Sequence, residues 1–385
     1  MNSESNNLHN INKNVFLGIM SGTSLDGVDV AAVSFVPSFK LIAFSSYPMP
    51  EDLKEKILEL CTPSANEIEK QGDLDIALGH FFAHCCLLFC QEHQAVIDKE
   101  HISAIGLHGQ TIRHRPFNQP KHNFTLQIAD ANTVAEITGL TTIADFRRRD
   151  IAAGGQGAPL VPAFHQSIFM SSEHKRAIIN IGGMANLTLL AKDDESPLLG
   201  FDTGPGNVLM DAWIHQQKGL SFDKNGEWAK TGNINHELLS RLISLDFFTQ
   251  DIPKSTGREQ FNLAWVNEHL NHITQRLSDA DIQATLTELS ALSIANEIAR
   301  YNFDDAQLYV CGGGAYNQYL MDRLRINLPK ATCVDSTATL NLAPDCVEAV
   351  AFAWLAQQTL SGLTSNSPSV TGAQGDRILG AIYQA

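Results

Sequence analysis

The sequence lacks the marks of a secreted, zinc-binding or membrane-spanning protein. Its seven cysteines form no Cys-x-x-Cys pair and no paired Cys/His spacing, so a zinc site is not expected. Their odd number and apolar surroundings indicate reduced thiols in a cytoplasmic protein. Residues 1–14 are polar, without the basic start and apolar core of a signal peptide. The most apolar stretch, 81–90, is too short to cross a bilayer.

Positive charge is also scarce. The 385 residues contain 27 Lys+Arg against 42 Asp+Glu, a formal net charge of −15. A field of that sign repels nucleic acid and anionic membranes, so neither is expected as a partner. Hydrophobic residues make up 44%, an ordinary globular fraction, and the length suggests two or three domains at roughly 150 residues each.

Familiar nucleotide and hydrolase motifs are missing as well. No Gly-x-x-x-x-Gly-Lys-Ser/Thr loop occurs, which excludes a Walker-type phosphate site. Ser24 lies between Gly22 and Gly27, one residue too far apart for the Gly-x-Ser-x-Gly elbow of serine hydrolases. The glycines at 312–314 follow a strand-like segment but lack the dinucleotide fingerprint.

What the sequence has is a strand and helix order that occurs twice. In the first half we expect strands at 15–20, 28–35, 41–47, 102–107 and 141–144, and helices at 51–61 and 68–99. In the second half we expect strands within 176–190 and at 197–201, 308–311 and 331–334, and helices at 208–217, 318–328 and 347–360. Each half thus has a glycine-containing hairpin, a strand with a glycine loop, and a short strand ending in Asp.

This alternation predicts an α/β fold of two related halves, each with a parallel or mixed sheet. Two such halves leave a cleft in which the loops at the strand ends meet a ligand. The segment 219–281 has no counterpart in the first half and is expected to form an extra helical piece or lid.

Three glycine-rich turns after strands favour a phosphate-binding function. Glycine lets the backbone approach a ligand, and consecutive amides then point at phosphate oxygens. The first turn adds the hydroxyls of Ser21, Thr23 and Ser24, and Asp26 is a candidate ligand for Mg²⁺. A tight hairpin without a ligand is the competing interpretation.

Asp202 is the first candidate for a catalytic base. It ends an apolar strand and precedes Gly204 and Gly206, so its side chain is expected in the cleft, where it can accept a proton from a hydroxyl or water. A helix cap is the competing role, and Asn207 fills that role better. Glu348 begins an apolar helix, and from sequence alone a site role and a helix-dipole role are equally open.

The arginines at 147–149 form the densest positive run. They are either a solvated charged face or a clamp for an anionic substrate group, which the fork geometry of arginine suits. The loop 254–258, with Lys254 and Arg258, is a second candidate of this kind, and His108 is a candidate hydrogen-bonding partner for a sugar or a carboxylate.

Taken together, these motifs resemble the anhydro-N-acetylmuramic acid kinase family. The resemblance rests on Met-Ser-Gly-Thr-Ser-Leu-Asp-Gly-Val-Asp at 20–29, and on segments 108–114, 144–150, 154–162, 180–183, 200–207, 254–259, 311–317 and 370–373. It implies a duplicated actin-like ATPase topology (ribonuclease H-like) around a nucleotide cleft. The implied boundaries are 1–145 plus 365–385 for one domain and 146–364 for the other. The implied reaction consumes 1,6-anhydro-N-acetylmuramic acid, ATP and water and yields N-acetylmuramic acid 6-phosphate and ADP, in peptidoglycan recycling.

By this resemblance Asp202 activates the water and Glu348 positions it, with Mg²⁺ at Asp26. The implied nucleotide-binding residues are Gly22, Thr23, Ser24, Leu25, Asp26, Gly27, Val28, Asp29, Gly182, Gly183, Asn186, Gly204, Gly206, Asn207, Gly312, Gly313, Gly314 and Ala315. The candidate substrate residues are Ser21, His108, Gln110, Thr111, Asp145, Arg148, Arg149 and Asp150.

Two further functions stay open at this point. One is a kinase of the same superfamily that phosphorylates a free sugar or carboxylate without hydrolysis. The second is a nucleotide-gated binding or filament module without a small substrate. The expected partner is a small sugar, and the sequence leaves a homodimer open.

Overall fold

The computed structural model describes residues 14–385 except 23, 117–121 and 194–195. The chain divides into two compact units. Unit 1 combines the first part of the chain, up to Phe164, with Cys346–Ala385, and unit 2 is His165–Asp345. These limits differ from the expected ones because the helices at 146–152 and 347–360 belong to unit 1.

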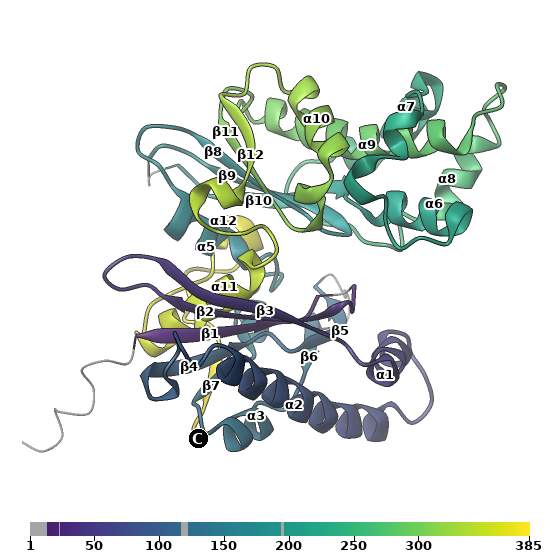
Figure 1. The fold of residues 1–385 in the computed structure, drawn as a ribbon. Helices are drawn as coiled ribbons and strands as arrows, with labels where there is room; N and C mark the ends of the chain where they lie inside the picture. The colour runs from purple at the N-terminus through teal and green to yellow at the C-terminus, as the bar shows by residue number, and fades with distance from the viewer. Residues whose placement is uncertain (1–13, 23, 117–121, 194–195) are drawn as a thin grey trace, which may run out of the picture. The chain divides into compact units, whose positions relative to one another are not determined.

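The helices and strands are labelled in Figure 1. In unit 1 they are β1 (Val15–Met20), β2 (Gly27–Ser34), β3 (Lys40–Pro48), α1 (Glu51–Cys61), α2 (Glu67–Glu92), β4 (Ile102–Leu107), β5 (Gln110–Arg115), β6 (Phe124–Ile128), α3 (Ala131–Thr138), β7 (Thr142–Ala144), α4 (Phe146–Ala152), α11 (Val347–Leu360), α12 (Pro368–Thr371) and β13 (Ala381–Tyr383). Helix α5 (Val161–Phe169) begins in unit 1 and ends in unit 2, because the boundary falls between Phe164 and His165. In unit 2 they are β8 (Arg176–Ile181), β9 (Met184–Leu190), β10 (Leu199–Pro205), α6 (Val208–Lys218), α7 (His236–Ile243), α8 (Leu263–Leu270), α9 (Asp279–Arg300), β11 (Gln307–Cys311), α10 (Gln318–Asn327) and β12 (Cys333–Ser336).

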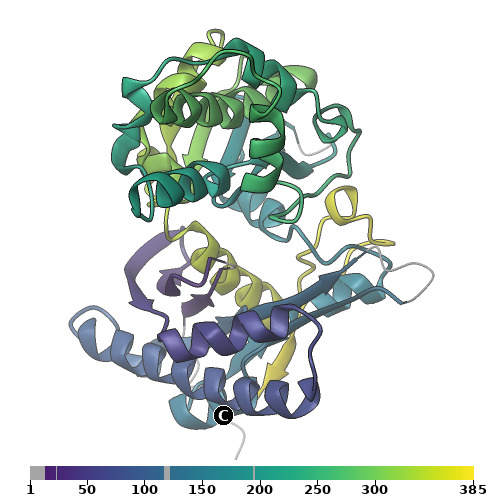
Figure 2. The same ribbon diagram turned by 90° about the vertical axis from the view of Figure 1, so that its right-hand side faces the viewer.

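Unit 1 is built on a mixed sheet with strand order β13-β7-β4-β1-β2-β3. Strands β1, β2 and β3 form an antiparallel meander, while β4 runs parallel to β1 and β7 parallel to β4. Helices α2 and α11 cover its two faces (Figures 1 and 2). Along β1, Leu17 and Ile19 join the core with α2, while Gly18 faces α11. Alternation of side chains across a strand produces this division.

Glycine is required where α11 crosses the sheet. A Cβ atom on Gly18 would lie 1.8 Å from the carbonyl oxygen of Ala349, and one on Gly106 would lie 2.0 Å from that of Phe352. Any larger residue would push the helix away from β1 and β4. The close approach of α11 therefore depends on these two residues.

Helix α2 is the one helix of the described residues that is long and apolar enough to cross a membrane. Its apolar side chains are instead part of the core of unit 1: Leu74, Leu78, Phe82 and Phe89 are at most 1% exposed. A buried core helix satisfies the same length and composition test, so the finding is weak support for a membrane span.

Unit 2 repeats the topology. Its sheet has the order β10-β9-β8-β11-β12, with β8, β9 and β10 antiparallel in succession and β11 and β12 parallel to β8. The two sheets share one order when their strands are counted along the chain within each sheet. The third strand (β3 or β10) lies at one edge, followed by the second (β2 or β9), the first (β1 or β8), the fourth (β4 or β11) and the fifth (β7 or β12). The prediction of an α/β fold with two halves of duplicated, actin-like topology is confirmed. Helices α6, α7, α9 and α10 pack around the core of this unit.

Most expected elements occur, and α1 and α11 have the expected bounds. Helix α2 ends at Glu92 instead of Lys99, and β10 continues past Asp202 to Pro205. The segment 219–281 is helical, with α7, α8 and short 3₁₀ turns. The arginines at 147–149, whose secondary structure the sequence left open, lie in α4.

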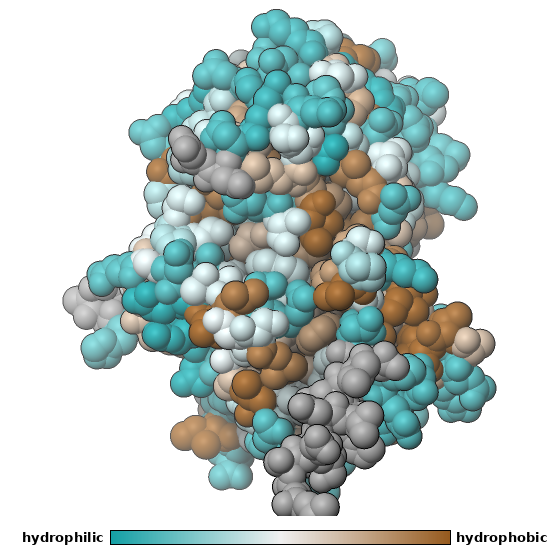
Figure 3. All heavy atoms as spheres, turned by 90° about the vertical axis from the view of Figure 1, so that its left-hand side faces the viewer, coloured by the Kyte–Doolittle hydropathy of each residue, from teal (hydrophilic) through white to brown (hydrophobic). Residues whose placement is uncertain are grey.

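The surface is mixed in character. On the face drawn in Figure 3, hydrophobic residues lie in several groups among hydrophilic ones, which is usual for protein surfaces. The homodimer that the sequence leaves open stays a prediction.

Candidate active site

The first group of candidate residues surrounds the loop between β1 and β2 in unit 1. The hydroxyl of Ser21, 1% exposed, donates a hydrogen bond to Oε1 of Gln110 (2.7 Å). The Gln110 amide group in turn donates to the carbonyl of Gly22 (3.4 Å). Gln110 begins β5, so a side chain from a different hairpin holds the base of the loop. Both polar ends of Gln110 are used in this way, which fits a positioning role for Ser21 and Gln110.

Some of the residues predicted to bind the nucleotide or Mg²⁺ in this loop are exposed to solvent, and others are buried. Ser24 and Asp26 are exposed, and a Cβ at Gly22 would meet nothing closer than 3.7 Å. The side chains of Leu25 and Val28 belong to the core and are therefore not exposed to a ligand. Asp29 and Gly27 are partly buried in β2, and Thr23 lies outside the described residues.

Near this loop, the guanidinium of Arg147 contacts the ring of His108. Arg147 donates from Nε (3.1 Å) and Nη2 (3.0 Å) to Nε2 of His108, and from Nη1 to the carbonyl of Gly157 (2.9 Å). Burial and the neighbouring Arg147 hold the pKa of His108 well below its usual value, so the ring is neutral at pH 7. Burial lowers the pKa of Arg147 to about 10, and the carboxylates of Glu348 and Asp150 oppose this effect.

The two following arginines have different positions. Arg148 and Arg149 are exposed, and Nη1 of Arg148 donates to Oδ2 of Asp145 (3.2 Å). Burial raises the pKa of Asp145, against the effect of Arg148. Arg147 belongs to the predicted anion-binding run, although Arg148 and Arg149 alone were named individually as substrate residues, and it is the arginine that points inward.

Asp150 is fully buried and joins two distant segments of unit 1. Its Oδ2 accepts from the amide of Gly157 (2.8 Å), and its Oδ1 accepts from Asn366 Nδ2 (3.0 Å) and the Thr371 hydroxyl (2.8 Å). With both oxygens used, Asp150 is suited to hold the glycine-rich segment 154–157 against the C-terminal segment. Sequence reasoning assigned no role to Asn366 or Thr371; the motif at 370–373 includes Thr371, and nothing in the sequence pointed to Asn366.

Glu348 lies in the first turn of α11 and is partly buried. Its charge favours the protonated form of Arg147 and so opposes the lowering of the Arg147 pKa by burial. Thr111 follows Gln110 in β5, where its hydroxyl accepts from the Gln127 amide (3.1 Å).

The second group lies in unit 2, where three glycine segments meet at the ends of β8, β10 and β11. The amides of Gly206 and Val208 donate to the carbonyl of Gly183 (2.9 and 3.1 Å), and that of Asn207 donates to Gly182 (2.8 Å). Gly314 packs on β8, where a Cβ would lie 2.4 Å from Ile181 Cγ2. These contacts bring together the predicted nucleotide residues at 182–183, 204–207 and 312–315.

Part of this cluster is open. A Cβ at Gly183 would meet no atom within 4 Å, and one at Gly313 would meet only Asn207 Nδ2, at 3.7 Å. In contrast, Gly312 has φ +75° and a Cβ there would lie 2.5 Å from Asn180 Oδ1. Ala315 donates its amide to the carbonyl of Gly312 (3.1 Å). The glycines thus combine tight packing on β8 with free space at 183 and 313.

Asp202 lies in the edge strand β10, at a position where the pairing with β9 shifts register. Its Oδ2 accepts from the amide of Thr256 (2.9 Å), and its own amide donates to the carbonyl of Lys254 (3.2 Å). Burial raises its pKa to about 6, against the opposing effects of the Thr256 amide and of Lys254. A carboxylate with this pKa is largely deprotonated at pH 7 and basic enough to accept a proton.

Asp202 is part of a polar row across the sheet. It pairs with Asn186 of β9, which pairs with Asn180 of β8. Because paired residues in neighbouring strands share a face, the three side chains lie on one face of the sheet. Their strand neighbours Phe201, Leu187 and Ile181 are in the core on the opposite face.

Two further expectations concern metals and the loop at 254–258. Among the described residues, no group of three or more His, Cys, Asp or Glu side chains is arranged to hold a metal ion. Lys254, considered as part of an anion-binding loop, is buried and bonded to Glu297 Oε1 (2.8 Å). Arg258 of the same loop is exposed.

A sequence model described as anhydro-N-acetylmuramic acid kinase matches residues 14–385. The chain belongs to the anhydro-N-acetylmuramic acid kinase family. A curated anhydro-N-acetylmuramic acid kinase of Shewanella pealeana is 49% identical over 378 residues, covering 97% of this chain and 100% of the relative. One of Coxiella burnetii is 47% identical over 371 residues, covering 96% and 98%. The expectation of a kinase is thereby confirmed at the level of the family.

Solved structures outside the anhydro-N-acetylmuramic acid kinase family are also similar, at low identity. An activator of 2-hydroxyisocaproyl-CoA dehydratase from Clostridium difficile matches with a TM-score of 0.43 and 11% identity, covering 91% of this chain and 98% of that one. A ROK family glucokinase from Streptomyces griseus matches with a TM-score of 0.38 and 12% identity, covering 89% and 99%.

Proposed function

We propose that this protein is the ATP-dependent kinase that opens 1,6-anhydro-N-acetylmuramic acid with water and phosphorylates its oxygen 6. The products are N-acetylmuramic acid 6-phosphate and ADP, which places the enzyme in peptidoglycan recycling. The observation that carries the proposal is Asp202, a carboxylate with a pKa of about 6 in a chain of this family.

The chemistry needs one base. Asp202 removes a proton from water as the water oxygen bonds to carbon 1 of the sugar. The bond from carbon 1 to oxygen 6 breaks, and oxygen 6 bonds to the γ-phosphorus of ATP while the bond to the ADP oxygen breaks. Water attacks opposite the departing oxygen, so we expect inversion at carbon 1, as with base-activated water in inverting glycosidases. Glu348 orients the water in this proposal.

The glycine segments fit the ATP part of the reaction. Phosphoryl transfer depends on positioning and on neutralised charge more than on covalent chemistry. The open positions at Gly22, Gly183 and Gly313 leave room for phosphate oxygens near the backbone. The exposed Asp26 carboxylate beside Ser24 fits Mg²⁺, which proteins often hold with one or two carboxylates and the nucleotide phosphates. Mg²⁺ would supply charge neutralisation at the phosphates.

The lactyl carboxylate of the muramic sugar needs a cation. We assign it to the arginine run or the His108 loop, and within these Arg147 is the inward-pointing candidate. His108 is neutral and holds two donors of the Arg147 guanidinium. The exposed Arg148 and Arg149 remain candidates for the same group.

Oxygen-18 water tests the hydrolytic step directly. The protein is incubated with ATP, Mg²⁺ and the anhydro-sugar, and the products are analysed by mass spectrometry. We expect one label in the sugar phosphate, at carbon 1, and none in the phosphoryl group. A phosphorylated product without label would identify a kinase that acts on a free hydroxyl.

Two controls test the carboxylate clamp and the binding or filament module. Anhydro-N-acetylglucosamine lacks the lactyl carboxylate, and equal kcat/KM for the two sugars would reject a carboxylate clamp. ATP consumption that does not depend on added sugar, or filaments that form with ATP, would favour the binding or filament module.

A further inference from the structure

The segment 250–256 in unit 2 lies along the free edge of β10. Its contacts with Asp202 are the amide of Thr256 on Oδ2 (2.9 Å) and the carbonyl of Lys254, which accepts from the Asp202 amide (3.2 Å). The segment has no helix or strand of its own at these residues. Its position against Asp202 must therefore come from additional contacts.

The strongest of these contacts is a buried ion pair. Lys254 Nζ lies 2.8 Å from Glu297 Oε1, and the two side chains are 1% and 3% exposed. The same ammonium donates to the carbonyl of Phe247 (3.3 Å) and lies 4.8 Å from the centre of the Phe247 ring. Two charges removed from water to this degree are costly unless paired, so each holds its partner in place.

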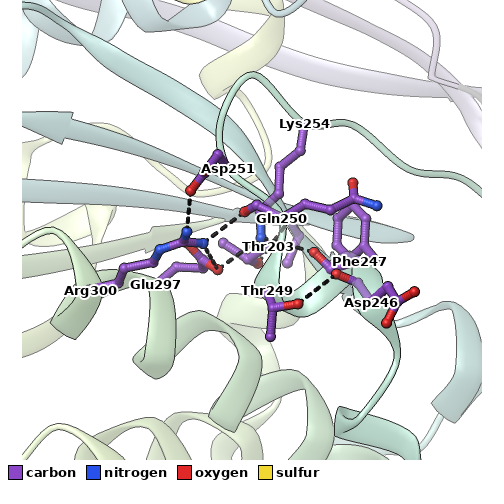
Figure 4. Close-up of polar contacts among 10 residues, drawn as sticks. Thr203, Asp246, Phe247, Thr249, Gln250, Asp251, Lys254, Glu297 and Arg300 are labelled. Atoms are coloured by element: carbon purple, nitrogen blue, oxygen red, sulfur yellow. Dashed lines mark hydrogen bonds and ion pairs between the residues drawn. The ribbon is translucent and has the colours of Figure 1, made fainter.

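Arg300, one turn further along α9, fixes the beginning of the segment. Its guanidinium donates to the carbonyl of Gln250 (2.7 Å) and to Asp251, and Nη1 lies 3.8 Å from Glu297 Oε1 (Figure 4). The last turn of α9 thus holds the segment at residues 250–251 and again at Lys254. Only Ser255 lies between this second point and Thr256.

We propose that the buried Lys254–Glu297 pair is a positioning device that keeps the Thr256 amide on the carboxylate of Asp202. Lys254 acts through the segment it anchors and through its charge, without contact with the substrate. This inference rests on the proposed role of Asp202 as the base.

The charged groups around Asp202 determine in which direction its pKa changes when the ion pair is removed. Lys254 and Asp251 lie on the segment, Glu297 and Arg300 on α9, and the neighbouring strand β9 contributes the neutral Asn186. Lys254 and the Thr256 amide both lower the pKa of Asp202. Losing the cation and loosening the amide must therefore raise the pH at which Asp202 loses its proton.

Two variants separate positioning from stability. Lys254→Met leaves Glu297 buried without its cation and should lower the melting temperature. The double variant Lys254→Met/Glu297→Leu removes both charges, and packed apolar side chains commonly replace a buried ion pair without loss of stability. Lys330→Met, in the exposed pair with Asp304 (2.8 Å) of the same unit, is the matched control.

Two measurements read the effect. Carbon-13 NMR follows the titration of the Asp202 carboxyl, assigned by the loss of its signal in Asp202→Asn, and the pH profile of kcat follows its role in turnover. In the double variant we expect the stability of the wild type and an unchanged KM for ATP. The titration of Asp202 and the acidic limb of the kcat profile should both shift upward by about one pH unit. Lys330→Met should change neither.

The possible results distinguish a failure of this inference from a failure of the proposed function. An Asp202 titration in the double variant that coincides with that of the wild type overturns the proposal and leaves Lys254 a structural residue. If the wild-type protein has no turnover of the anhydro-sugar, the proposed function fails, while the NMR titration still decides whether Lys254 acts on Asp202.

Discussion

The two units have the same strand order but use the first hairpin differently. In unit 1, the residues between β1 and β2 form a loop that Gln110 holds at Ser21 and Gly22. In unit 2, β8 and β9 are joined by Gly182 and Gly183 alone. The longer loop offers hydroxyl and carboxylate groups, whereas the short turn offers open backbone. The comparison teaches that the same strand order can carry two different surfaces at its first hairpin.

The units also differ in the ionisable groups among their candidate residues. In unit 1, Arg147, His108 and Glu348 interact, and the pKa of His108 is lowered. In unit 2, Asp202 is the carboxylate whose pKa is raised to about 6. We therefore expect unit 1 to recognise anionic groups and unit 2 to remove the proton.

Replacing the proposed base, Asp202, should have the largest effect on turnover. A small effect would contradict the division of roles between the two units. Asp202→Asn should lower kcat by about 10²–10⁴-fold, the usual contribution of a general base, because the amide cannot accept the proton from water. Nucleotide binding should persist, measured by calorimetry with an ATP analogue. Turnover near the wild-type value would remove Asp202 from the role of base.

The next effect concerns stability and should be confined to unit 1. Gly18→Ala places a Cβ 1.8 Å from the Ala349 carbonyl oxygen, so α11 must shift, at a cost of about 3 kcal/mol. Gly183→Ala in unit 2 is the control, because a Cβ there meets nothing within 4 Å. Urea unfolding followed by tryptophan fluorescence and circular dichroism compares the two. Equal stabilities would contradict the close approach of α11.

Asp150→Asn should have a smaller effect, again in unit 1. The replacement turns one of two accepting oxygens into a donor, so the Gly157 amide or the Asn366 and Thr371 donors lose their acceptor. A buried donor without a partner costs about 1–3 kcal/mol in the free energy of unfolding, which urea unfolding measures. Asp304→Asn, which removes an exposed ion pair with Lys330, should have a clearly smaller effect in the same measurement.

A further effect is the pH dependence of stability that arises from Asp202. Its folded-state pKa is raised to about 6, so its contribution to stability is present below the unfolded-state value and is lost as pH rises through about 6. Asp202→Asn should therefore gain stability relative to the wild type between pH 4 and pH 7. Turnover should change in the opposite sense, rising with pH through the same range. Parallel stability curves for the two proteins would show that the pKa is not raised.

The sequence predicts the fold well because the pattern is local. Apolar strands, glycine turns and amphipathic helices are read within short windows, so α1 and α11 have the expected bounds. The β5–β6 hairpin was missed because its strands carry polar residues such as Arg113 and His114. The assignment of α11 to unit 1 depends on contacts with β1 and β4, far away in the chain, which no local pattern records.

The site is predicted less completely. Asp202 stands out because it follows an apolar strand and precedes glycines, and burial in the structure raises its pKa to about 6. Three consecutive arginines give no sign of which one points inward, because that depends on the rotation of α4 against its neighbours. Nor does any motif pair Lys254 with Glu297, which is contributed by a different element.

The discontinuous make-up of unit 1 has a consequence for biosynthesis. Strands β1 and β4 leave the ribosome before unit 2, but α11, which covers one face of their sheet, leaves it only after unit 2. All of unit 2 is synthesised in between and can complete its own core first, since domains fold as units. Until Cys346–Ala385 emerges, the nascent chain carries a sheet with Gly18 and Gly106 facing no helix. A nascent chain stalled before residue 346 should therefore expose this face to chaperones, whereas the finished chain covers it.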